Sequence, residues 1–345
     1  MIIRNLNTKA ITLFAAAGSV CITPGCSLIN DDLEPCPKEL RLCFKQAYLK
    51  DTDAFKAEVN SINIWAFNSE GTPVWSGSAS GPALKEEGFY IPTPLQEGKY
   101  DFVAWCGLKD NENFDLATYT PTSKTDLEVK LKTIEENEQN ISRNHLQGLY
   151  HGMIENVVYE ADSFRPTIKD VTVSLIKDTK DIRIMLQHLD GSEIDNKDFS
   201  VTITDNNGNY AWDNALLTSE TVTYCPWNVK YGIVTAPEAE RQDTRDISTV
   251  ASLMFELSTG RLMTDSNAIL TVHRNWDDRD IIRIPLVEYL LLIRGYYGNI
   301  SDQDYLDLQD DYSMVFFIDA ASNWYTAMGI YINGWAVVPP QSQPL

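Results

Sequence analysis

Short runs in which apolar and polar residues alternate recur along most of the chain. In one of them, Leu40, Leu42 and Phe44 alternate with Arg41 and Lys45. A period of two places apolar side chains on one face of a strand and polar side chains on the other. Similar runs contain Ile62, Ile64 and Ala66; Tyr100, Phe102 and Ala104; Leu127, Val129 and Leu131; Val171, Val173 and Leu175; Ile182, Ile184 and Leu186; and Phe199, Val201 and Ile203. The pattern predicts an all-β protein of antiparallel sheets packed as sandwiches.

The spacing of these runs predicts two tandem β-sandwich domains. The 345 residues are enough for about two domains of ordinary size. A polar segment at residues 160–167 interrupts the periodicity. We therefore predict an N-terminal domain over residues 39–163 and a C-terminal domain over residues 164–345.

The second domain is expected to hold a few short helices and one marked turn. Pro285 suits a first helical position, and Ser301 with Asp304 makes a capping-box variant. Residues 205–208 (Asp-Asn-Asn-Gly) predict a hairpin turn. Further strands are predicted near residues 253–257, 269–272, 314–318 and 327–338.

The N-terminus resembles an export signal followed by a lipid attachment site. Arg4 and Lys9 precede an apolar stretch over residues 10–20, which is too short to span a bilayer as a helix. Gly25 is the small residue that lipoprotein signal peptidases favour before a cysteine, so we predict a signal peptide over residues 1–25 and lipidation at Cys26. Cys21 is the alternative lipid site, and a plain secretory signal is the alternative to lipidation. Residues 26–38 would form an acidic tether.

The net charge restricts the partners. The formal charge is −21, and the first 25 residues hold two cations and no acid, so the rest of the chain carries −23. Such a surface repels phosphate backbones, and we expect no nucleic-acid partner. Attachment to a membrane is expected through the N-terminal lipid rather than through a charged face.

The sequence contains no motif that is typical of a catalytic or metal-binding site. The six cysteines include no C-x-x-C pair, and no G-x-S-x-G or H-E-x-x-H motif occurs. Five aspartates could suggest calcium, but on a helix they are better explained by the dipole and by water: Asp302, Asp304, Asp307, Asp310 and Asp311. We predict no enzyme activity, no metal and no cofactor.

The aromatic residues and the remaining cysteines leave alternatives open. Trp65, Trp105 and Trp335 lie in strand-like runs, where packing in the core or on a sheet face is the expected role. A glycan-binding platform is the alternative use of the eight tryptophans and sixteen tyrosines. Cys36, Cys43, Cys106 and Cys225 remain after signal cleavage, and the sequence assigns no disulfide pairs.

Several segments, in order along the chain, resemble the fimbrial anchor lipoproteins of Bacteroidetes, the family of major- and minor-fimbrium anchoring subunits. The matching segments are residues 26–37, 40–44, 67–71, 98–105, 175–179, 303–307, 312–317 and 332–335. The resemblance implies two β-sandwich domains of transthyretin-like, Greek-key type. It also implies a lipid-anchored, surface-exposed protein of the outer membrane that holds the base of a fimbrium, with fimbrial structural subunits as partners. A surface lipoprotein that captures glycans is the alternative function.

The C-terminal segment, residues 325–338, is the candidate contact with a fimbrial subunit. Its pattern predicts one strand, ended by prolines at 339 and 340, with Ile330, Ile332 and Val338 on one side and Tyr331 and Val337 on the other. The strand either closes its own domain or pairs with a neighbouring subunit through strand addition. The candidate partner-binding residues are Ile330, Ile332, Trp335 and Val337.

Overall fold

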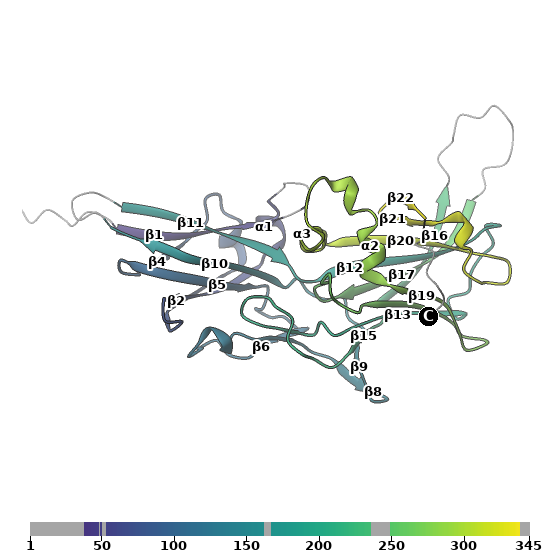
Figure 1. Ribbon diagram of the computed structural model, residues 1–345, viewed down its shortest axis with the longest axis horizontal. Helices are drawn as coiled ribbons and strands as arrows, with labels where there is room; N and C mark the ends of the chain where they lie inside the picture. The colour runs from purple at the N-terminus through teal and green to yellow at the C-terminus, as the bar shows by residue number, and fades with distance from the viewer. Residues whose placement is uncertain (1–37, 48, 50–52, 162–166, 236–248, 339–345) are drawn as a thin grey trace, which may run out of the picture. The chain divides into compact units, whose positions relative to one another are not determined.

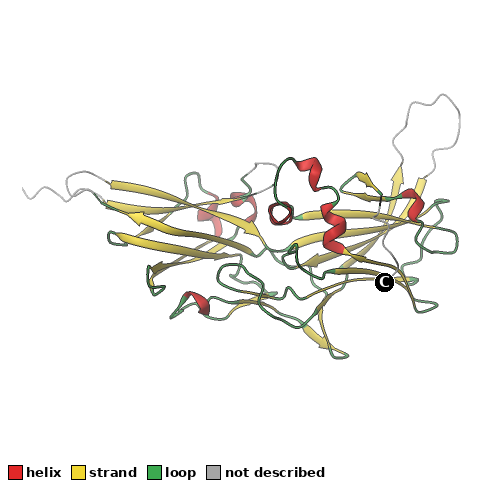
Figure 2. Ribbon diagram, viewed as in Figure 1, coloured by secondary structure: helices red, strands yellow, loops and turns green. Residues whose placement is uncertain are grey.

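The computed structural model describes residues 38–47, 49, 53–161, 167–235 and 249–338. Strands dominate these residues, and the helices are short (Figure 2). The prediction of a mostly β chain is confirmed. Four short helices lie in the second half as expected, and three that the sequence did not predict lie in the first half.

One seven-stranded sheet contains most of the first half of the chain (Figure 1). Its strands, in spatial order, are β3 (Pro73–Ser80), β2 (Ser61–Asn68), β5 (Gly98–Cys106), β10 (Tyr150–Tyr159), β11 (Thr167–Lys177), β1 (Lys38–Gln46) and β4 (Ile91–Thr93). The predicted alternation in β1 is confirmed, because Leu40, Leu42 and Phe44 are buried between more exposed neighbours. β5 is buried on both faces, with Phe102 in one apolar cluster and Trp105 in another.

Two six-stranded sheets follow. The β20 sheet contains, in order, β16 (Asn228–Thr235), β17 (Thr249–Thr259), β12 (Lys180–His188), β20 (Asp311–Ile318), β21 (Ile330–Ile332) and β22 (Trp335–Val337). The β13 sheet contains β19 (Arg279–Pro285), β18 (Ile269–Arg274), β13 (Phe199–Asp205), β15 (Val222–Tyr224), β9 (Gln139–Ser142) and β8 (Ile134–Glu136). Their inward-facing side chains, such as Ile184, Phe316, Val201 and Val272, share one hydrophobic core.

The remaining elements are small. A three-stranded sheet consists of β14 (Asn209–Tyr210), β7 (Val129–Leu131) and β6 (Phe114–Leu116). The helical segments are α1 (Phe55–Glu58), η1 (Gly81–Lys85), η2 (Lys124–Asp126), α2 (Leu286–Leu291), η3 (Arg294–Tyr297), α3 (Asp302–Leu308) and η4 (Thr326–Met328). The predicted cap of α3 is confirmed, since the Asp304 amide donates to the Ser301 hydroxyl at 3.0 Å. Pro285 lies one position earlier than predicted, as the N-cap of α2.

Strand pairing crosses the midpoint of the chain. β11 follows residue 163 in sequence, yet it pairs in parallel with β1 and antiparallel with β10. β9, from the first half, pairs with β15 of the second half. Sheet membership therefore changes at Asp178 and Thr179, between β11 and β12, downstream of the boundary that polarity predicted.

The segment at residues 205–208 is not the predicted hairpin. β13, which precedes it, pairs with β15 and β18, whereas β14, which follows it, pairs with β7. Asn207 is fully buried, where its amide donates to the Arg261 carbonyl and its side-chain oxygen accepts from Tyr224. These buried hydrogen bonds fix the turn so that the chain passes to another sheet.

Candidate functional site

The C-terminal segment folds as a hairpin rather than as the single predicted strand. β21 and β22 pair through Ile330↔Val337 and Ile332↔Trp335, around a turn at Asn333 and Gly334. Both turn residues have positive φ, 48° and 84°, as a two-residue type I′ turn requires. Asn333 also ties the turn to β20: its amide donates to the Ser313 carbonyl, and its side-chain oxygen accepts from the Ser313 amide, each at 2.8 Å.

The hairpin divides the four predicted partner-binding residues into two pairs. Ile330 and Ile332 are fully buried in the shared core. Trp335 and Val337 lie on β22, at the edge of the β20 sheet, and are more exposed. Of the two packing roles expected for the tryptophans, Trp65 and Trp105 are buried in the core, whereas Trp335 is 44% exposed and packs outside it.

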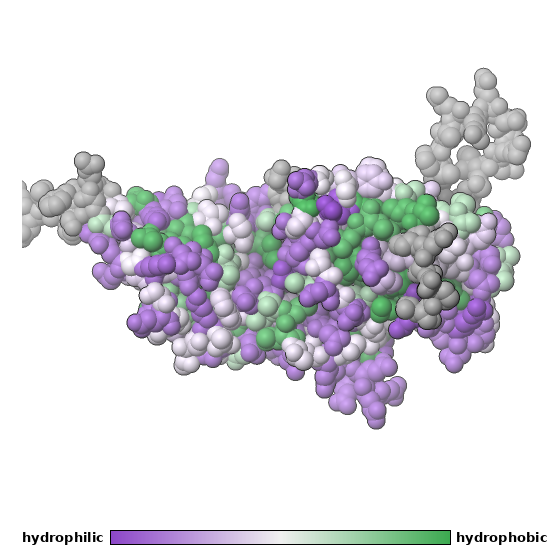
Figure 3. Space-filling model, viewed as in Figure 1, coloured by the Kyte–Doolittle hydropathy of each residue, from purple (hydrophilic) through white to green (hydrophobic). Residues whose placement is uncertain are grey.

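An exposed aromatic pair accompanies this edge. The ring of Trp335 stacks on that of Tyr296 in η3, with centroids 4.0 Å apart and planes 8° from parallel. Tyr296 is 55% exposed. Hydrophobic residues gather on the surface where β20, β21 and β22 are drawn (Figures 1 and 3). The hairpin therefore combines a buried inner side with an exposed apolar and aromatic margin.

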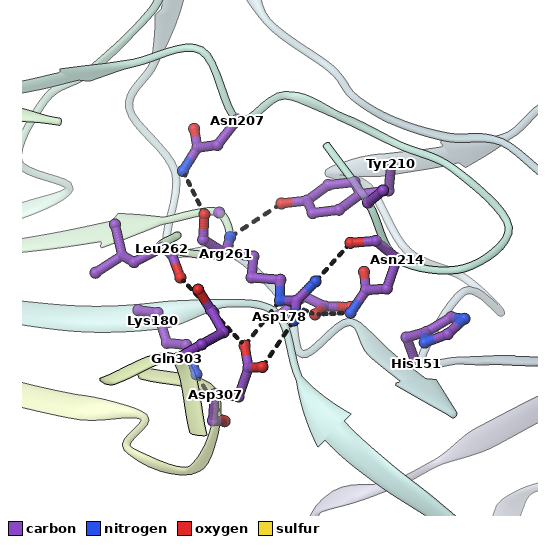
Figure 4. A network of polar contacts seen from close by, with 12 residues as sticks. His151, Asp178, Lys180, Asn207, Tyr210, Asn214, Arg261, Leu262, Gln303 and Asp307 are labelled. Atoms are coloured by element: carbon purple, nitrogen blue, oxygen red, sulfur yellow. Dashed lines mark hydrogen bonds and ion pairs between the residues drawn. The ribbon is translucent and has the colours of Figure 1, made fainter. Parts of the chain in front are cut away.

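A buried polar network lies where the chain passes between sheets (Figure 4). The Arg261 guanidinium donates two hydrogen bonds to the Asp307 carboxylate, at 2.8 and 2.7 Å. Its Nε also lies 4.0 Å from Asp178, which accepts a hydrogen bond from the Asn214 amide at 2.8 Å. Lys180 pairs with Asp310 at 3.1 Å and is fully buried. These groups are engaged with one another, and they fix the β11–β12 connection to α3.

Burial shifts the pKa of groups in and beside this network. It raises the pKa of Asp178 to about 7, against the opposing effect of Arg261. It lowers the pKa of His151 to about 4, although the hydrogen bond to the Trp212 carbonyl opposes the shift. His151 packs against Trp105, with ring centroids 4.6 Å apart. This arrangement suits a neutral histidine whose role is packing.

A polar hollow of about 600 Å³ lies beside this network and is a candidate site for a small ligand. Its lining includes Glu58, Tyr150, Lys177, His145 and Asp181. Tyr150 donates to Glu58 at 3.2 Å, and Lys177 lies 3.8 Å from the same carboxylate. His145 lies 3.3 Å from Asp181. The four ionisable side chains of the last two pairs are thus engaged within the wall, which leaves them poorly placed to recognise a ligand.

Most of the five aspartates considered for calcium pair with cationic side chains. Asp307 and Asp310 bind Arg261 and Lys180, and Asp302 pairs with Arg294 at 2.8 Å. Among the described residues, no group of three or more His, Cys, Asp or Glu could hold a metal ion. Three cysteines in this part of the chain are free: Cys43, Cys106 and Cys225. Cys21, Cys26 and Cys36 lie outside the described residues, as does the predicted signal peptide.

Residues 33–338 match the family model described as fimbrillin-A associated anchor proteins Mfa1 and Mfa2. The chain belongs to this Mfa2 family. The family is one of fimbrial anchors and adhesins, structural and non-catalytic in kind, which implies a location at the cell surface. The comparison with curated proteins found no match.

Solved structures agree with membership of the Mfa2 family. A candidate adhesin from Bacteroides thetaiotaomicron is 30% identical, with a TM-score of 0.75 over 89% of this chain and 99% of that one. A candidate polysaccharide-binding protein from the same organism is 27% identical, with a TM-score of 0.72 over 89% and 99%. The fimbrial anchor protein Mfa2 from Porphyromonas gingivalis shares the fold, with 16% identity and a TM-score of 0.64 over 88% and 99%.

Sequence reasoning missed two parts of the hairpin site in this Mfa2-family chain. The dipeptide Asn333-Gly334 is a strong hairpin signal, and it would have divided the predicted strand correctly. Tyr296 carries no local signal, because its contact with Trp335 joins residues that are far apart in sequence.

Among the described residues, no helix is long and apolar enough to cross a membrane.

Proposed function

We propose that the chain is an outer-membrane lipoprotein, exposed on the cell surface, that anchors the base of a fimbrium. The match of residues 33–338 to the fimbrial anchor family carries this proposal. The N-terminal sequence supports the lipid anchor, with acyl chains including palmitate on Cys26 and an acidic tether over residues 26–38. Two acyl signals or more are needed for stable anchoring by lipid alone. The fold is proposed to consist of two transthyretin-like sandwiches; the sequence pattern divides them into residues 39–163 and 164–345, and sheet membership changes at Asp178 and Thr179.

The contact with a fimbrial structural subunit is proposed to form by strand addition at β22. Because β22 ends the β20 sheet, one of its sides pairs with β21 and the other offers backbone groups to a new strand. Ile330 and Ile332 hold the hairpin on the core, since both are fully buried. Trp335 and Val337 lie on the strand that would meet the subunit.

Replacement of the lipidated cysteine tests the anchor. Cys26→Ala should move the protein from the membrane fraction to the medium, and the cells should shed their fimbriae. Cys21→Ala is the matched control and should change neither result. Mass spectrometry of the mature N-terminus identifies the acylated residue. A Cys26→Ala protein that stays in the membrane and retains fimbriae would contradict the proposal.

Glycan capture is the second candidate function. The exposed stack of Tyr296 and Trp335 favours it, because aromatic rings at a surface can bind sugar rings. A relative 27% identical is described as a candidate polysaccharide-binding protein. Titration of the purified protein with soluble polysaccharides, beside a Tyr296→Ala variant, tests this function. Binding that is unchanged in the variant, or no binding by the wild type, would rule out a role for the aromatic pair.

A further inference from the structure

On the outward face of the β20 sheet, a line of apolar side chains crosses five of the six strands, and Lys230 of β16 continues it. Strand register places Met254 of β17 beside Met185 of β12, and Met185 beside Val315 of β20. It continues from Val315 to Tyr331 of β21 and from Tyr331 to Ala336 of β22. Residues that are paired across a sheet project to the same face. We call these five residues the outer row; all five are partly or largely exposed.

β20, the central strand of the outer row, has the composition of a strand that is covered on both faces. In β20, residues 314–318 read Met-Val-Phe-Phe-Ile, with Met314, Phe316 and Ile318 in the core and Val315 and Phe317 facing outward. β5 has a comparable run, residues 102–106, and both of its faces are buried. Near-continuous apolar strands are typical of sheets with two covered faces. The composition of β20 therefore indicates that another surface covers the outer row when the protein functions.

The charges beside the outer row cancel locally. Lys230 and Glu256 form an ion pair at 2.8 Å, and Arg183 lies 3.7 Å from both Glu256 and Asp311. Burial alone would raise the pKa of Glu256, but the hydrogen bonds from Lys230 and Asn228 hold this pKa below its usual value. Two cations thus offset two carboxylates here, and a third outward carboxylate, Asp181, lies opposite Asp311 and 3.3 Å from His145, so the strip carries little net charge on a chain of net charge −21. An apolar partner can approach this strip without the repulsion that such a charge imposes elsewhere.

The chemistry of the outer row favours a protein surface over a sugar. Methionine is flexible and adapts to an apposed apolar surface, and two methionines form the β17–β12 end of the outer row. The nearest ring pair, Phe317 and Tyr331, is T-shaped, with planes 73° apart, so it offers no flat platform for a sugar ring. The adjacent polar groups of Arg183 and Glu256 are engaged with each other.

The position of the outer row identifies the partner. It ends at Ala336, whose backbone N–H and C=O point away from β21, because residue pairs alternate in an antiparallel hairpin closed by Ile332 and Trp335. A strand added to β22 would place alternate side chains on the same face, next to this small residue. The outer row is thus continuous with the edge assigned above to the subunit.

We propose that the outer row is a docking face for the fimbrial structural subunit, which would contact this protein through a sheet face as well as through the β22 edge. The inference rests on the proposed function, because it takes the same partner. It adds a second, side-chain-mediated contact that backbone pairing alone does not require.

The experiment compares two kinds of variant in the full mature chain. Val315→Thr combined with Tyr331→Thr removes apolar surface from the outer row and keeps strand-forming residues. Ala336→Pro instead removes the outward N–H of the edge strand. The matched control, Thr202→Ala with Thr271→Ala, alters a cross-strand pair on the outward face of the β13 sheet. Biolayer interferometry measures binding to the structural subunit purified from fimbriae sheared from the producing cells, and thermal unfolding checks that each variant folds.

The expected result is an affinity at least tenfold weaker for the outer-row variant, with an unfolding temperature close to that of the wild type and full affinity in the control. Normal binding by the outer-row variant, with loss in Ala336→Pro, would overturn the docking face and leave the anchor function standing. No binding by the wild type would overturn the proposed function itself. A wild-type dimer in light scattering that the outer-row variant converts to a monomer would assign the face to a second copy, and would also overturn the proposal.

Discussion

The two six-stranded sheets share a core and face the solvent with opposite chemistry. On the β13 sheet, the outward register line contains Thr202, Thr271 and Arg283. On the β20 sheet, the corresponding line is the outer row, with methionine, valine and tyrosine. Scattered apolar residues on a surface are ordinary, but a contiguous apolar line marks a binding surface.

This difference separates what the fold needs from what the function needs. The inward residues of both sheets, such as Ile203 and Phe316, pack in the shared core. A solvated outward face of hydroxyls and charges is sufficient for stability, as the β13 sheet illustrates. The apolar outward face of the β20 sheet therefore needs a reason outside the folding of the monomer.

The largest expected effect comes from a pair of adjacent residues on β21 that face opposite ways. Ile332→Ala should cost about 2–5 kcal/mol in the free energy of unfolding, because it opens a cavity in the core. Tyr331→Ala, on the outer row and 38% exposed, should cost about 1 kcal/mol or less. Urea unfolding followed by fluorescence measures both values. Equal losses would mean that the outer row belongs to the folded core, which would remove the contrast between the two sheets.

The sequence predicted many strands because each local pattern reports its own inward face. Leu40, Leu42 and Phe44 located β1, and Ile182, Ile184 and Leu186 located β12. Periodicity does not encode the partner of a strand, since pairing depends on contacts far apart in sequence. The sequence pattern therefore could not predict the parallel pairing of β1 with β11 or the change of sheet at Asp178.

The position of the candidate site was predictable from the sequence, but its folding into a hairpin was not predicted. The sequence located the C-terminal segment, but the turn signal of Asn333 and Gly334 was overlooked in favour of a longer strand. Exposure of Trp335 follows from that hairpin, because β22 becomes the edge of the sheet. The outer row also left a trace in the sequence, since Met185 and Val315 occupy positions where strict alternation calls for polar residues.

A smaller effect should come from pH, and it should arise in the interior rather than on either outward face. The pKa of His151 is lowered to about 4 from an ordinary 6.5, so the unfolded chain binds a proton that the folded chain excludes between these values. Stability should fall as the pH drops through this window, by up to about 3 kcal/mol at pH 4 from this group. Asp178, with a pKa raised to about 7, acts in the opposite direction.

The contribution of His151 to the pH dependence of stability is the difference between the wild type and a variant in which this residue cannot titrate. His151→Gln keeps a donor for the Trp212 carbonyl and cannot titrate. Urea unfolding between pH 4 and 7.5 should show that the wild type loses more stability on acidification than this variant does. The control, Tyr331→Ala, should follow the wild-type profile. Parallel profiles for the wild type and His151→Gln would show that the histidine is not held neutral.

The smallest effect should come from making the solvated face resemble the apolar one. Thr202 and Thr271 are direct cross-strand neighbours on the β13 sheet, and valine has nearly their shape and favours strands. Thr202→Val with Thr271→Val should change the free energy of unfolding by no more than about 0.5 kcal/mol, because neither side chain enters the core. Affinity for the fimbrial subunit should not change either, since this face is not continuous with the β22 edge. Urea unfolding and biolayer interferometry measure the two quantities. A gain in subunit affinity would mean that apolar surface of any kind suffices, and that the register of the outer row with the hairpin edge has no part in recognition.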